Sequence, residues 1–299
     1  MRVILPILLF STVAYAEEVP PMEQPLDPSG GGGGGEMTGD VTTSAPAAGS
    51  FWLPIIERPY ILPKGKLQAY GDVRIQHVTT PMTPVTPETS RTDIGLHLGA
   101  GYGVTDKITA GVEYAFTLHD FEIKGPLTLY GEYQLIHQSK LSVAASGDLT
   151  FDFGGRDSMG GTSVDVSLHA GLGARYLVAP KMAVYTGAPY GPGPVGQHLT
   201  VPFDGDSAIT FDIPVGFAYQ AMPQLFVYAQ TQLLRFNIAN KGGADTVVVI
   251  GSDAGGVPLT LGGLYQVTSD IDATAALVFP DLGGIGDKLA FVVGARWHN

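Results

Sequence analysis

GAGYGVTDKITAGVEYAF, residues 99–116, consists of two alternating runs joined by the short polar turn VTDK. Every second residue is apolar on both sides of that turn, including Tyr102 before it and Ile108, Val112 and Tyr114 after it. Alternation with a period of two indicates strands that have one apolar and one polar face. The stretch therefore predicts an antiparallel hairpin, and its many glycines leave little side-chain bulk on the polar face.

The same alternation recurs from residue 66 to the end of the chain, and no window there has the stripe of an amphipathic helix. Twelve alternating segments are expected, at 66–78, 92–104, 107–119, 126–137, 139–153, 162–178, 181–188, 207–219, 223–236, 257–269, 271–280 and 287–297. The sequence therefore predicts an all-β domain.

The connections between these segments differ in length in a regular way. Those after the even-numbered segments, such as VTDK and VAPK, are tight, whereas those after the odd-numbered segments are mostly long. Each of the five tight turns is preceded by a Gly and then a Tyr. Short turns at one end and long loops at the other are typical of an up-and-down barrel that crosses a membrane. The repeat spacing also fits propeller blades, and a soluble all-β fold stays open as an alternative.

The width of such a barrel indicates whether the polar face of the strands lines the interior or faces outward. A closed barrel of about twelve strands is too wide inside for a compact apolar core, so the bulky apolar faces are expected to lie outward against lipid. The aromatic residues close to the tight turns share that outward face and the same level, which predicts a girdle at one membrane edge. These girdle residues are Tyr102, Tyr176, Tyr219, Tyr265 and Trp297.

The composition excludes several classes of function. The chain has 299 residues, of which 15% are charged and 44% hydrophobic, and its formal net charge is −12. This acidity argues against nucleic-acid binding, which needs clustered Lys and Arg. The absence of Cys excludes disulfides and thiolate metal sites. No apolar run of about 18 residues lies beyond the first sixteen residues, so helical membrane spans are not expected.

The N-terminal region precedes the alternating part and has a different character. Residues 1–16 combine Arg2, an apolar core and the ending Ala14-Tyr15-Ala16, which predicts a secretory signal peptide. Residues 17–62, rich in Pro and Gly, are predicted to be a flexible periplasmic tether, followed by the barrel over 63–299. The apolar, proline-interrupted stretch 51–65 is expected to be an extended lead-in that docks at a rim of the barrel.

These features together resemble the bacterial outer-membrane β-barrel proteins, in particular porin-like channels. The resemblance covers about residues 60–299 and includes the ending LAFVVGARWHN, although Trp297 is followed by His298 and Asn299, whereas such barrels usually end on an aromatic residue. It implies a transmembrane antiparallel up-and-down barrel of about twelve strands, with a range of 10–14, in the bacterial outer membrane. It also implies the lipid bilayer and the barrel insertion machinery as partners; the oligomeric state stays open.

The polar faces supply candidate pore-lining residues. Acidic residues outnumber basic ones in this set, which predicts a weak preference for cations. The alternative is that the acids and bases pair across strands and merely fill the lumen. A three-residue turn would place His97 opposite Glu113. The candidates are Asp72, Arg74, Asp93, His97, Lys107, Glu113, Glu132, Asp148, Asp152, Asp165, Arg175, Asp212, Asp272 and Arg296.

No motif indicates catalysis, a metal site or a cofactor. The histidines are scattered without ligand spacing, and the glycine clusters are not followed by a helix. The chain is therefore predicted not to be an enzyme. A hydrolase that uses His137 and Ser139 is the weakest of three hypotheses. The first is a passive, narrow channel for small hydrophilic solutes, and the second is a non-conducting barrel that binds a partner through its long loops.

Overall fold

In the computed structural model, the chain is described over residues 54–80, 88–117, 125–156, 162–191, 196, 198–203, 209–239, 247–250, 257–282 and 288–299. The predicted signal peptide and nearly all of the predicted tether lie outside these ranges. A single 3-10 turn, η1 (Ile55–Glu57), precedes the strands. Within the described ranges no helix is both long and apolar enough to span a membrane.

The rest of the described chain is almost entirely strand. The strands are β1 (Leu67–Thr80), β2 (Thr89–Thr105), β3 (Ile108–Thr117), β4 (Pro126–His137), β5 (Leu141–Arg156), β6 (Thr162–Ala179), β7 (Met182–Thr186), β8 (Leu199–Pro202), β9 (Ile209–Met222), β10 (Leu225–Ala239), β11 (Val247–Ile250), β12 (Leu259–Gln266), β13 (Ile271–Phe279) and β14 (Lys288–His298).

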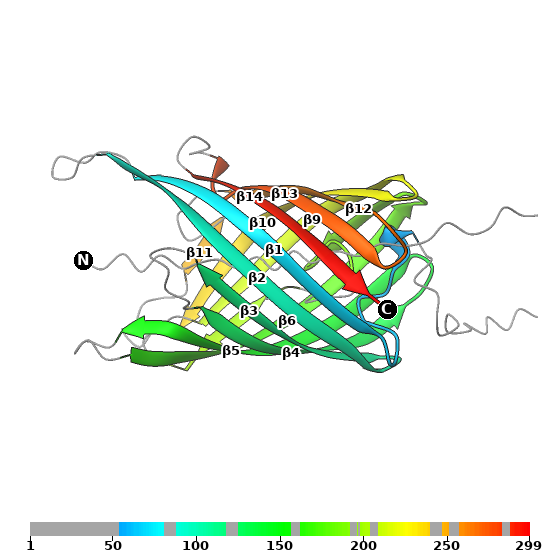
Figure 1. The fold of residues 1–299 in the computed structure, drawn as a ribbon, viewed down its shortest axis with the longest axis horizontal. Helices are drawn as coiled ribbons and strands as arrows, with labels where there is room; N and C mark the ends of the chain where they lie inside the picture. The colour runs from blue at the N-terminus through cyan, green and yellow to red at the C-terminus, as the bar shows by residue number, and fades with distance from the viewer. Residues whose placement is uncertain are drawn as a thin grey trace, which may run out of the picture.

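These strands form a closed antiparallel barrel of twelve positions (Figure 1). β7 and β8 share one position between β6 and β9, and β11 and β12 share another beside β10. The barrel closes where β14 pairs with β1, from Gln68 opposite His298 to Val78 opposite Lys288. All-β class, barrel topology and strand number agree with the prediction.

The two ends of the barrel differ as the connection lengths predict. Strands β2 and β3, β4 and β5, β6 and β7, β9 and β10, and β12 and β13 are joined by tight connections at one end, which we call the turn end. The strand ends that the longer connections join, such as Thr80 and Thr89 of β1 and β2, lie at the opposite end, which we call the loop end (Figure 1). The apolar run Val247–Ile250, expected either to fold inward or to extend a hairpin, pairs with β10 as strand β11.

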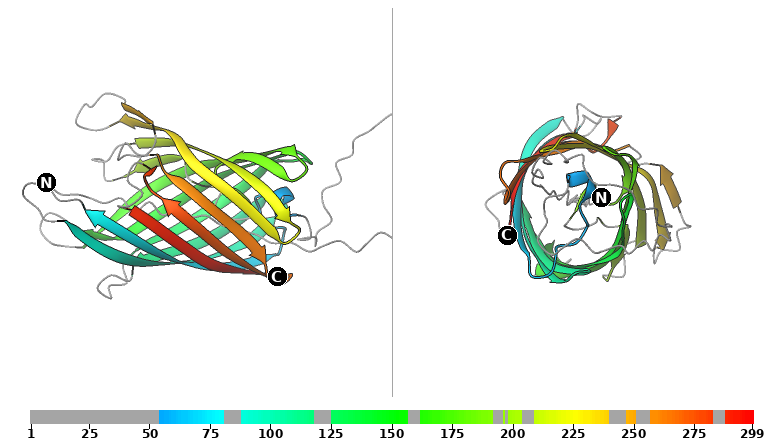
Figure 2. Two further views of the ribbon diagram at one scale, coloured as in Figure 1. Left: turned by 90° about the horizontal axis from the view of Figure 1, so that it is seen from above. Right: turned by 90° about the vertical axis from the view of Figure 1, so that its right-hand side faces the viewer.

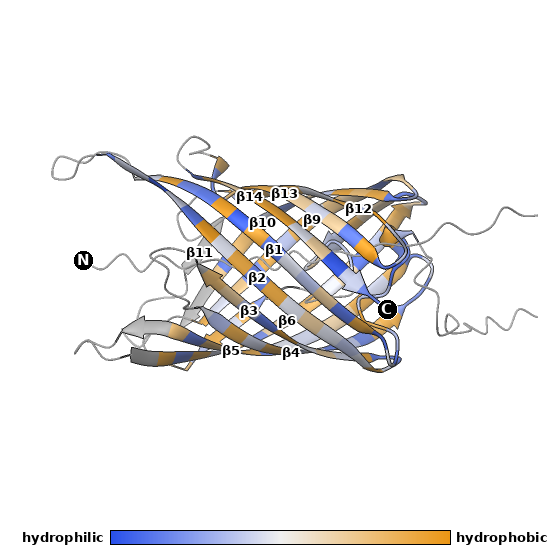
Figure 3. Ribbon diagram, viewed as in Figure 1, coloured by the Kyte–Doolittle hydropathy of each residue, from blue (hydrophilic) through white to orange (hydrophobic). Residues whose placement is uncertain are grey.

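Alternation separates the two faces of the wall. Outward positions carry large apolar side chains that are exposed, and the hydropathy colouring follows this pattern along each strand (Figure 3). Four inward tyrosines lie directly over glycines of the neighbouring strand, where any side chain would collide with the ring. The tyrosines are Tyr70, Tyr130, Tyr185 and Tyr228, over Gly99, Gly111, Gly216 and Gly262.

Candidate functional site

The turn half of the lumen holds a segment of the chain that precedes the first strand. We call residues 54–63 the lumen segment; it lies inside the ring of strands and carries η1 (Figure 2). Its side chains Ile55, Ile56, Tyr60, Ile61 and Leu62 are all at most 3% exposed. Burying an aliphatic side chain of this size stabilises the buried state by about 1.5–3 kcal/mol. The segment is therefore a packed part of the barrel.

Barrel side chains also bind the backbone of the lumen segment. The N–H of Ile56 donates to Gln220 Oε1 at 3.2 Å, and the N–H of Tyr60 donates to Gln134 Oε1 at 2.9 Å. The N–H of Leu62 donates to Thr109 Oγ1 at 2.7 Å. A segment without strand partners has its backbone polar groups satisfied in this way, which burial requires.

Gln134 and Gln220 have the same local role at two separate turns. Each follows a tyrosine of the Gly…Tyr repeat, and each points inward. The Gln134 amide donates to Ile136 O and Val143 O, and the Gln220 amide donates to Met222 O, where the strand registers shift. Each glutamine therefore uses its amide N–H groups to bind carbonyls at an irregular strand end and its oxygen to bind the lumen segment.

A second inward element meets the lumen segment from the wall. Between β7 and β8 the described residues 187–191, 196 and 198, which we call the inward loop, leave the wall. Tyr190 packs edge-on against Phe226 and Tyr228, at centroid distances of 5.5 and 5.7 Å. The Tyr60 hydroxyl donates to Ala188 O at 3.2 Å. Gly191 lies so close to the Tyr60 backbone that no side chain fits there.

Two arginines lie over aromatic rings of the turn half, and a third lies beside a carboxylate. Arg175 donates a hydrogen bond to the Arg58 carbonyl and lies 5.2 Å from the Tyr60 ring centre. Arg296 lies 5.0 Å from the Tyr70 ring centre, and Arg58 lies 3.9 Å from the Asp272 carboxylate. Cations over aromatic faces are attracted by the ring quadrupole. Burial raises the pKa of Glu57, against the opposing effect of Arg175.

The lumen segment revises the predicted organisation. The sequence assigns residues 54–62 to the flexible tether, and 51–65 to a rim-docking lead-in, because three prolines interrupt the apolar pattern. In the structure residues 54–62 pack inside the barrel. Their apolar side chains have no strand position to occupy, and the lumen is where they avoid water.

The wall as a whole identifies the class of protein. The barrel closes completely between β14 and β1, and its outward face is apolar while its inner face is polar. A closed barrel satisfies every wall hydrogen bond without an exposed edge, as lipid requires. The chain is a transmembrane β-barrel. The barrel has the strand number and inverted polarity of the outer-membrane class.

Comparison with known proteins gives distant resemblances only. No family model and no curated protein matches the chain. Among solved structures, the COG4313 outer membrane channel from Pseudomonas putida F1 is 13% identical with a TM-score of 0.48, covering 80% of this chain and 97% of that one. The KdgM porin is 8% identical with a TM-score of 0.45, covering 76% and 98%. The translocator domain of autotransporter NalP from Neisseria meningitidis is 8% identical with a TM-score of 0.41, covering 79% and 89%. At these values none of them informs the function of this chain.

Most candidate pore-lining residues of the loop half are engaged by neighbours. Asp212 accepts hydrogen bonds from Arg235 at 2.5 and 2.7 Å and from Gln232 at 2.5 Å. Asp93 contacts Arg91 at 3.1 Å. Asp152 and Asp165 face each other across β5 and β6, and both are exposed. Lys107 lies in the tight turn after β2 and is exposed, outside the lumen wall.

Two further candidates stand on inward positions of the wall. Glu132 of β4 is 2% exposed and lies opposite Thr109 of β3 and Ser146 of β5. Arg74 of β1 lies opposite Gly95 of β2, where the absence of a side chain leaves room for the long arginine. Both therefore belong to the inner face, as alternation predicts.

His97 joins two carboxylates, although the predicted register is wrong. It lies opposite Ala115, because a bulge at Gly103 and Thr105 shifts the pairing, so Glu113 lies diagonal to it. Its Nδ1 is 2.9 Å from Asp72 Oδ2, and its Nε2 is 3.5 Å from Glu113 Oε1. The Tyr70 hydroxyl donates to the same Glu113 oxygen at 2.5 Å. At this position the candidate residues pair with one another across strands, as the alternative interpretation of the lumen charges expects.

The sequence does not predict the Ser–His–Asp contact that the structure forms on β5 and β6. His169 Nδ1 is 2.5 Å from Asp148 Oδ1, and His169 Nε2 is 3.2 Å from Ser167 Oγ. Catalysis also needs donors for an oxyanion. Ser167 pairs with both β5 and β8, so its backbone N–H belongs to the strand ladder. We interpret the contact as a polar network of the lumen wall.

The hydrolase hypothesis finds no assembled site. His137 ends β4 and Ser139 lies in the following turn. Within the described residues, His137 Nδ1 has no hydrogen-bond partner. A nucleophile and its base need a hydrogen bond between them, which this pair does not form through that nitrogen.

The predicted girdle residues all lie on the outer face near the turn end. Tyr102, Tyr176, Tyr219, Tyr265 and Trp297 are 40–53% exposed. The two residues after Trp297 are held by the neighbouring turn and by the first strand. His298 Nε2 contacts Ser269 O at 2.8 Å, and Asn299 Oδ1 accepts the N–H of Leu67 at 2.8 Å.

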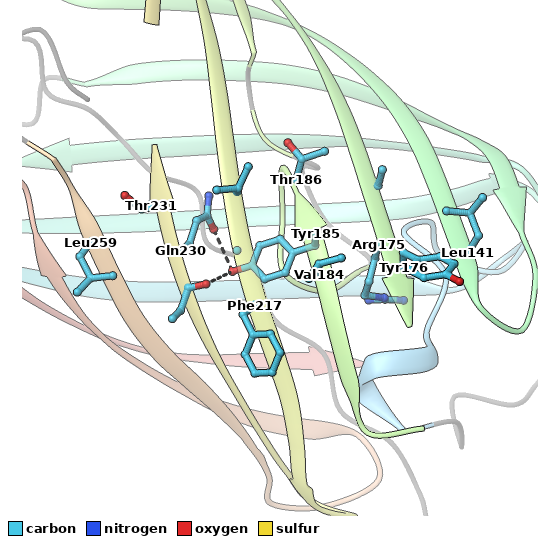
Figure 4. Close-up of a pocket in the computed structure, with 14 residues that line it drawn as sticks. Leu141, Arg175, Tyr176, Val184, Tyr185, Thr186, Phe217, Gln230, Thr231 and Leu259 are labelled. Carbon is cyan, nitrogen blue, oxygen red and sulfur yellow. Dashed lines mark hydrogen bonds between the residues drawn. The ribbon is translucent and has the colours of Figure 1, made fainter. Parts of the chain in front are cut away.

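An apolar groove of about 630 Å³ lies in the wall where β6, β7, β9, β10 and β12 contribute side chains (Figure 4). Val184, Phe217 and Leu259 line it, and the Tyr185 hydroxyl turns away toward Ala229 O and Gln230 Oε1. Thr186 donates to Pro214 O, and Thr231 donates to Pro258 O, each at 2.6 Å. These hydroxyls satisfy carbonyls that would otherwise face lipid.

Proposed function

We propose that this barrel is a passive channel in the bacterial outer membrane for small hydrophilic solutes, with a weak preference for cations. The observation that carries the proposal is the polar, charged inner face of a closed barrel whose outer face is apolar. Charged groups along an open lumen set the field that ions cross, and the exposed carboxylates Asp152 and Asp165 are available for that role.

The acid-rich loop half supports the cation preference. Asp93, Asp152 and Asp165 stand on its inward positions, and Asp152 and Asp165 are exposed opposite one another. Two exposed carboxylates side by side raise the local concentration of counter-cations. In this proposal the turn end and the tether that precedes residue 54 lie in the periplasm, and solutes enter from the loop end.

The lumen segment sets the size limit in this proposal. Residues 54–62 and the inward loop occupy the turn half, so only the cross-section left beside them remains for solutes. The same packing favours the second hypothesis, a barrel that conducts nothing and binds a partner through its long loops. The two hypotheses differ in a single measurable property, which is conductance.

Purified protein inserted into planar bilayers tests the proposal. We expect small, discrete conductance steps and a reversal potential in a salt gradient that indicates a modest cation preference. Insertion is verified separately by heat-modifiable gel migration of the same sample. Silence at verified insertion would contradict the channel and favour the non-conducting barrel.

A further inference from the structure

The apolar groove of Figure 4 lies on the outer, lipid-facing side of the wall. Tyr176 of β6, Val184 of β7 and Phe217 of β9 line it, and all three are outward positions that are 40–48% exposed. Leu141 of β5 and Leu259 of β12 line its two flanks. The groove is therefore continuous with the surface through which the barrel contacts the bilayer.

The threonine hydroxyls in the groove are already engaged by the wall. Thr186 donates to Pro214 O and Thr231 donates to Pro258 O, each at 2.6 Å. The surface that is left toward the membrane is apolar, so it favours a hydrocarbon occupant over a hydrophilic one. The groove volume of about 630 Å³ is within the range of pockets that bind small ligands.

The groove begins at the level of the aromatic girdle and runs toward the middle of the wall. One end lies at Tyr176, a girdle residue, and on β9 the groove extends from Phe217 to Val215. Val215 is four residues from Tyr219, the girdle residue of β9, which is about 13 Å along a strand. One leaflet of the hydrocarbon core is about 15 Å thick. The groove therefore matches the depth of one leaflet, with one end at the headgroups.

Two exposed lysines lie at the girdle end of the groove. Lys140 directly precedes Leu141 in the turn between β4 and β5, and Lys181 lies in the turn between β6 and β7. The Lys140 carbonyl accepts the N–H of Leu177 at 2.8 Å, so Lys140 lies beside the end of β6 from which the second turn continues. Among the five tight turns, these two carry a lysine without an acidic residue. Positive charge at the headgroup level attracts anionic lipid.

A hydrocarbon groove that ends beside two cations has the chemistry of a lipid site. We infer that the barrel holds one anionic phospholipid, with its acyl chain in the groove and its phosphate between Lys140 and Lys181. An empty groove would leave its walls without packing partners. A second barrel fits less well, because a stable protein interface needs about 800 Å² per partner and a convex wall does not enter a narrow hollow. The inference goes beyond the proposed channel and does not depend on conduction.

The test needs a reporter inside the groove. The chain has two tryptophans. In a background of Trp52→Phe and Trp297→Tyr, the variant Phe217→Trp carries a single indole, at the groove. Phosphatidylglycerol with brominated acyl chains is titrated into this protein in detergent, and bromine quenches the fluorescence of an indole that it contacts. We expect quenching to saturate near one phosphatidylglycerol per barrel.

A matched reporter separates a bound lipid from the belt of lipid around any membrane barrel. Val112→Trp, in the same background, lies on β3 outside the groove, and Val112 is 39% exposed against 40% for Phe217. Its partner Ala100 is two residues from Tyr102, as Phe217 is from Tyr219, so both reporters lie at the same level. We expect quenching of Val112→Trp only with lipid in large excess. Equal quenching of the two reporters at every lipid ratio would overturn the site.

Two further variants test the chain and headgroup contacts separately. Ala229→Phe places a ring in the groove and should raise the lipid concentration for half-maximal quenching severalfold. Lys140→Gln combined with Lys181→Gln should do the same for phosphatidylglycerol, but not for brominated phosphatidylcholine, which has no net charge. Unchanged binding of phosphatidylglycerol to either variant, with folding verified by heat-modifiable migration, would contradict the inference. A dimer that protects the Phe217→Trp indole from quenching would assign the groove to a second copy instead.

Discussion

The turn half and the loop half of the lumen use the same alternating strands, yet they are filled in different ways. The turn half contains the lumen segment, the inward loop and buried tyrosines, and its polar groups mostly contact this packing. The loop half carries the Asp212–Arg235 ion pair and acids that remain exposed, Asp152 and Asp165. A membrane barrel can therefore hold a folded core at one end while keeping an aqueous vestibule at the other.

The largest expected difference between the two halves is in the free energy of unfolding lost when a side chain is truncated. Phe226 is fully buried in the aromatic cluster of the turn half. Phe226→Ala is expected to lower the free energy of unfolding by about 3–5 kcal/mol, because it removes contacts and leaves a cavity. Thr150→Ala, in the loop half, should cost about 1 kcal/mol, for the hydrogen bonds that Thr150 makes with Thr128 and Asp148. Urea unfolding in lipid vesicles measures both, and equal costs would contradict a packed turn half.

The glutamines that bind the lumen segment should show a smaller effect. Gln134→Ala removes the acceptor for Tyr60 N–H and the donor to two strand-end carbonyls. We expect a loss of about 1–3 kcal/mol in the same unfolding assay. Gln138→Ala, in the exposed turn after β4, is the control and should change stability by less than about 0.5 kcal/mol. A harmless Gln134→Ala would mean that the segment does not depend on this contact.

The smallest effect is expected among the exposed acids of the loop half. Asp165→Asn removes one of two facing carboxylates and should reduce the cation preference slightly, with no change in stability beyond about 0.5 kcal/mol. The reversal potential in a salt gradient measures the first quantity and urea unfolding the second. A cation preference that rises on this substitution would contradict an aqueous, acid-lined vestibule.

The strands of the barrel wall could be predicted from the sequence because the direction of each side chain follows from the local alternation of apolar and polar residues. Alternation fixes which residues of GAGYGVTDKITAGVEYAF face outward, and Ile108 and Tyr102 do so in the structure. The length of each connection likewise reveals the end at which it lies. Strand positions, loop asymmetry and outward aromatic residues were therefore predictable from the residues themselves.

The filling of the lumen was not predictable in the same way, because it depends on contacts across the barrel. Tyr60 meets Ala188 and Gln134, which are far away in sequence, and the bulge near Gly103 changes the partner of His97. One available clue was missed: the lead-in carries Ile55, Ile56 and Leu62, too many apolar residues for a segment left in water. The inward tyrosines are matched by glycines in the sequence: each tyrosine lies over a glycine of the neighbouring strand, which leaves room for its ring.

The lumen segment is the feature that distinguishes the two halves, and its removal tests the account most directly. Single-channel conductance is compared between the full chain and a variant that lacks residues 54–62, with deletion of residues 38–46 in the predicted tether as the control. The account predicts a several-fold larger conductance for the first deletion and an unchanged one for the second, with both variants verified as folded by heat-modifiable migration. A folded barrel whose conductance is the same with and without residues 54–62 would contradict it.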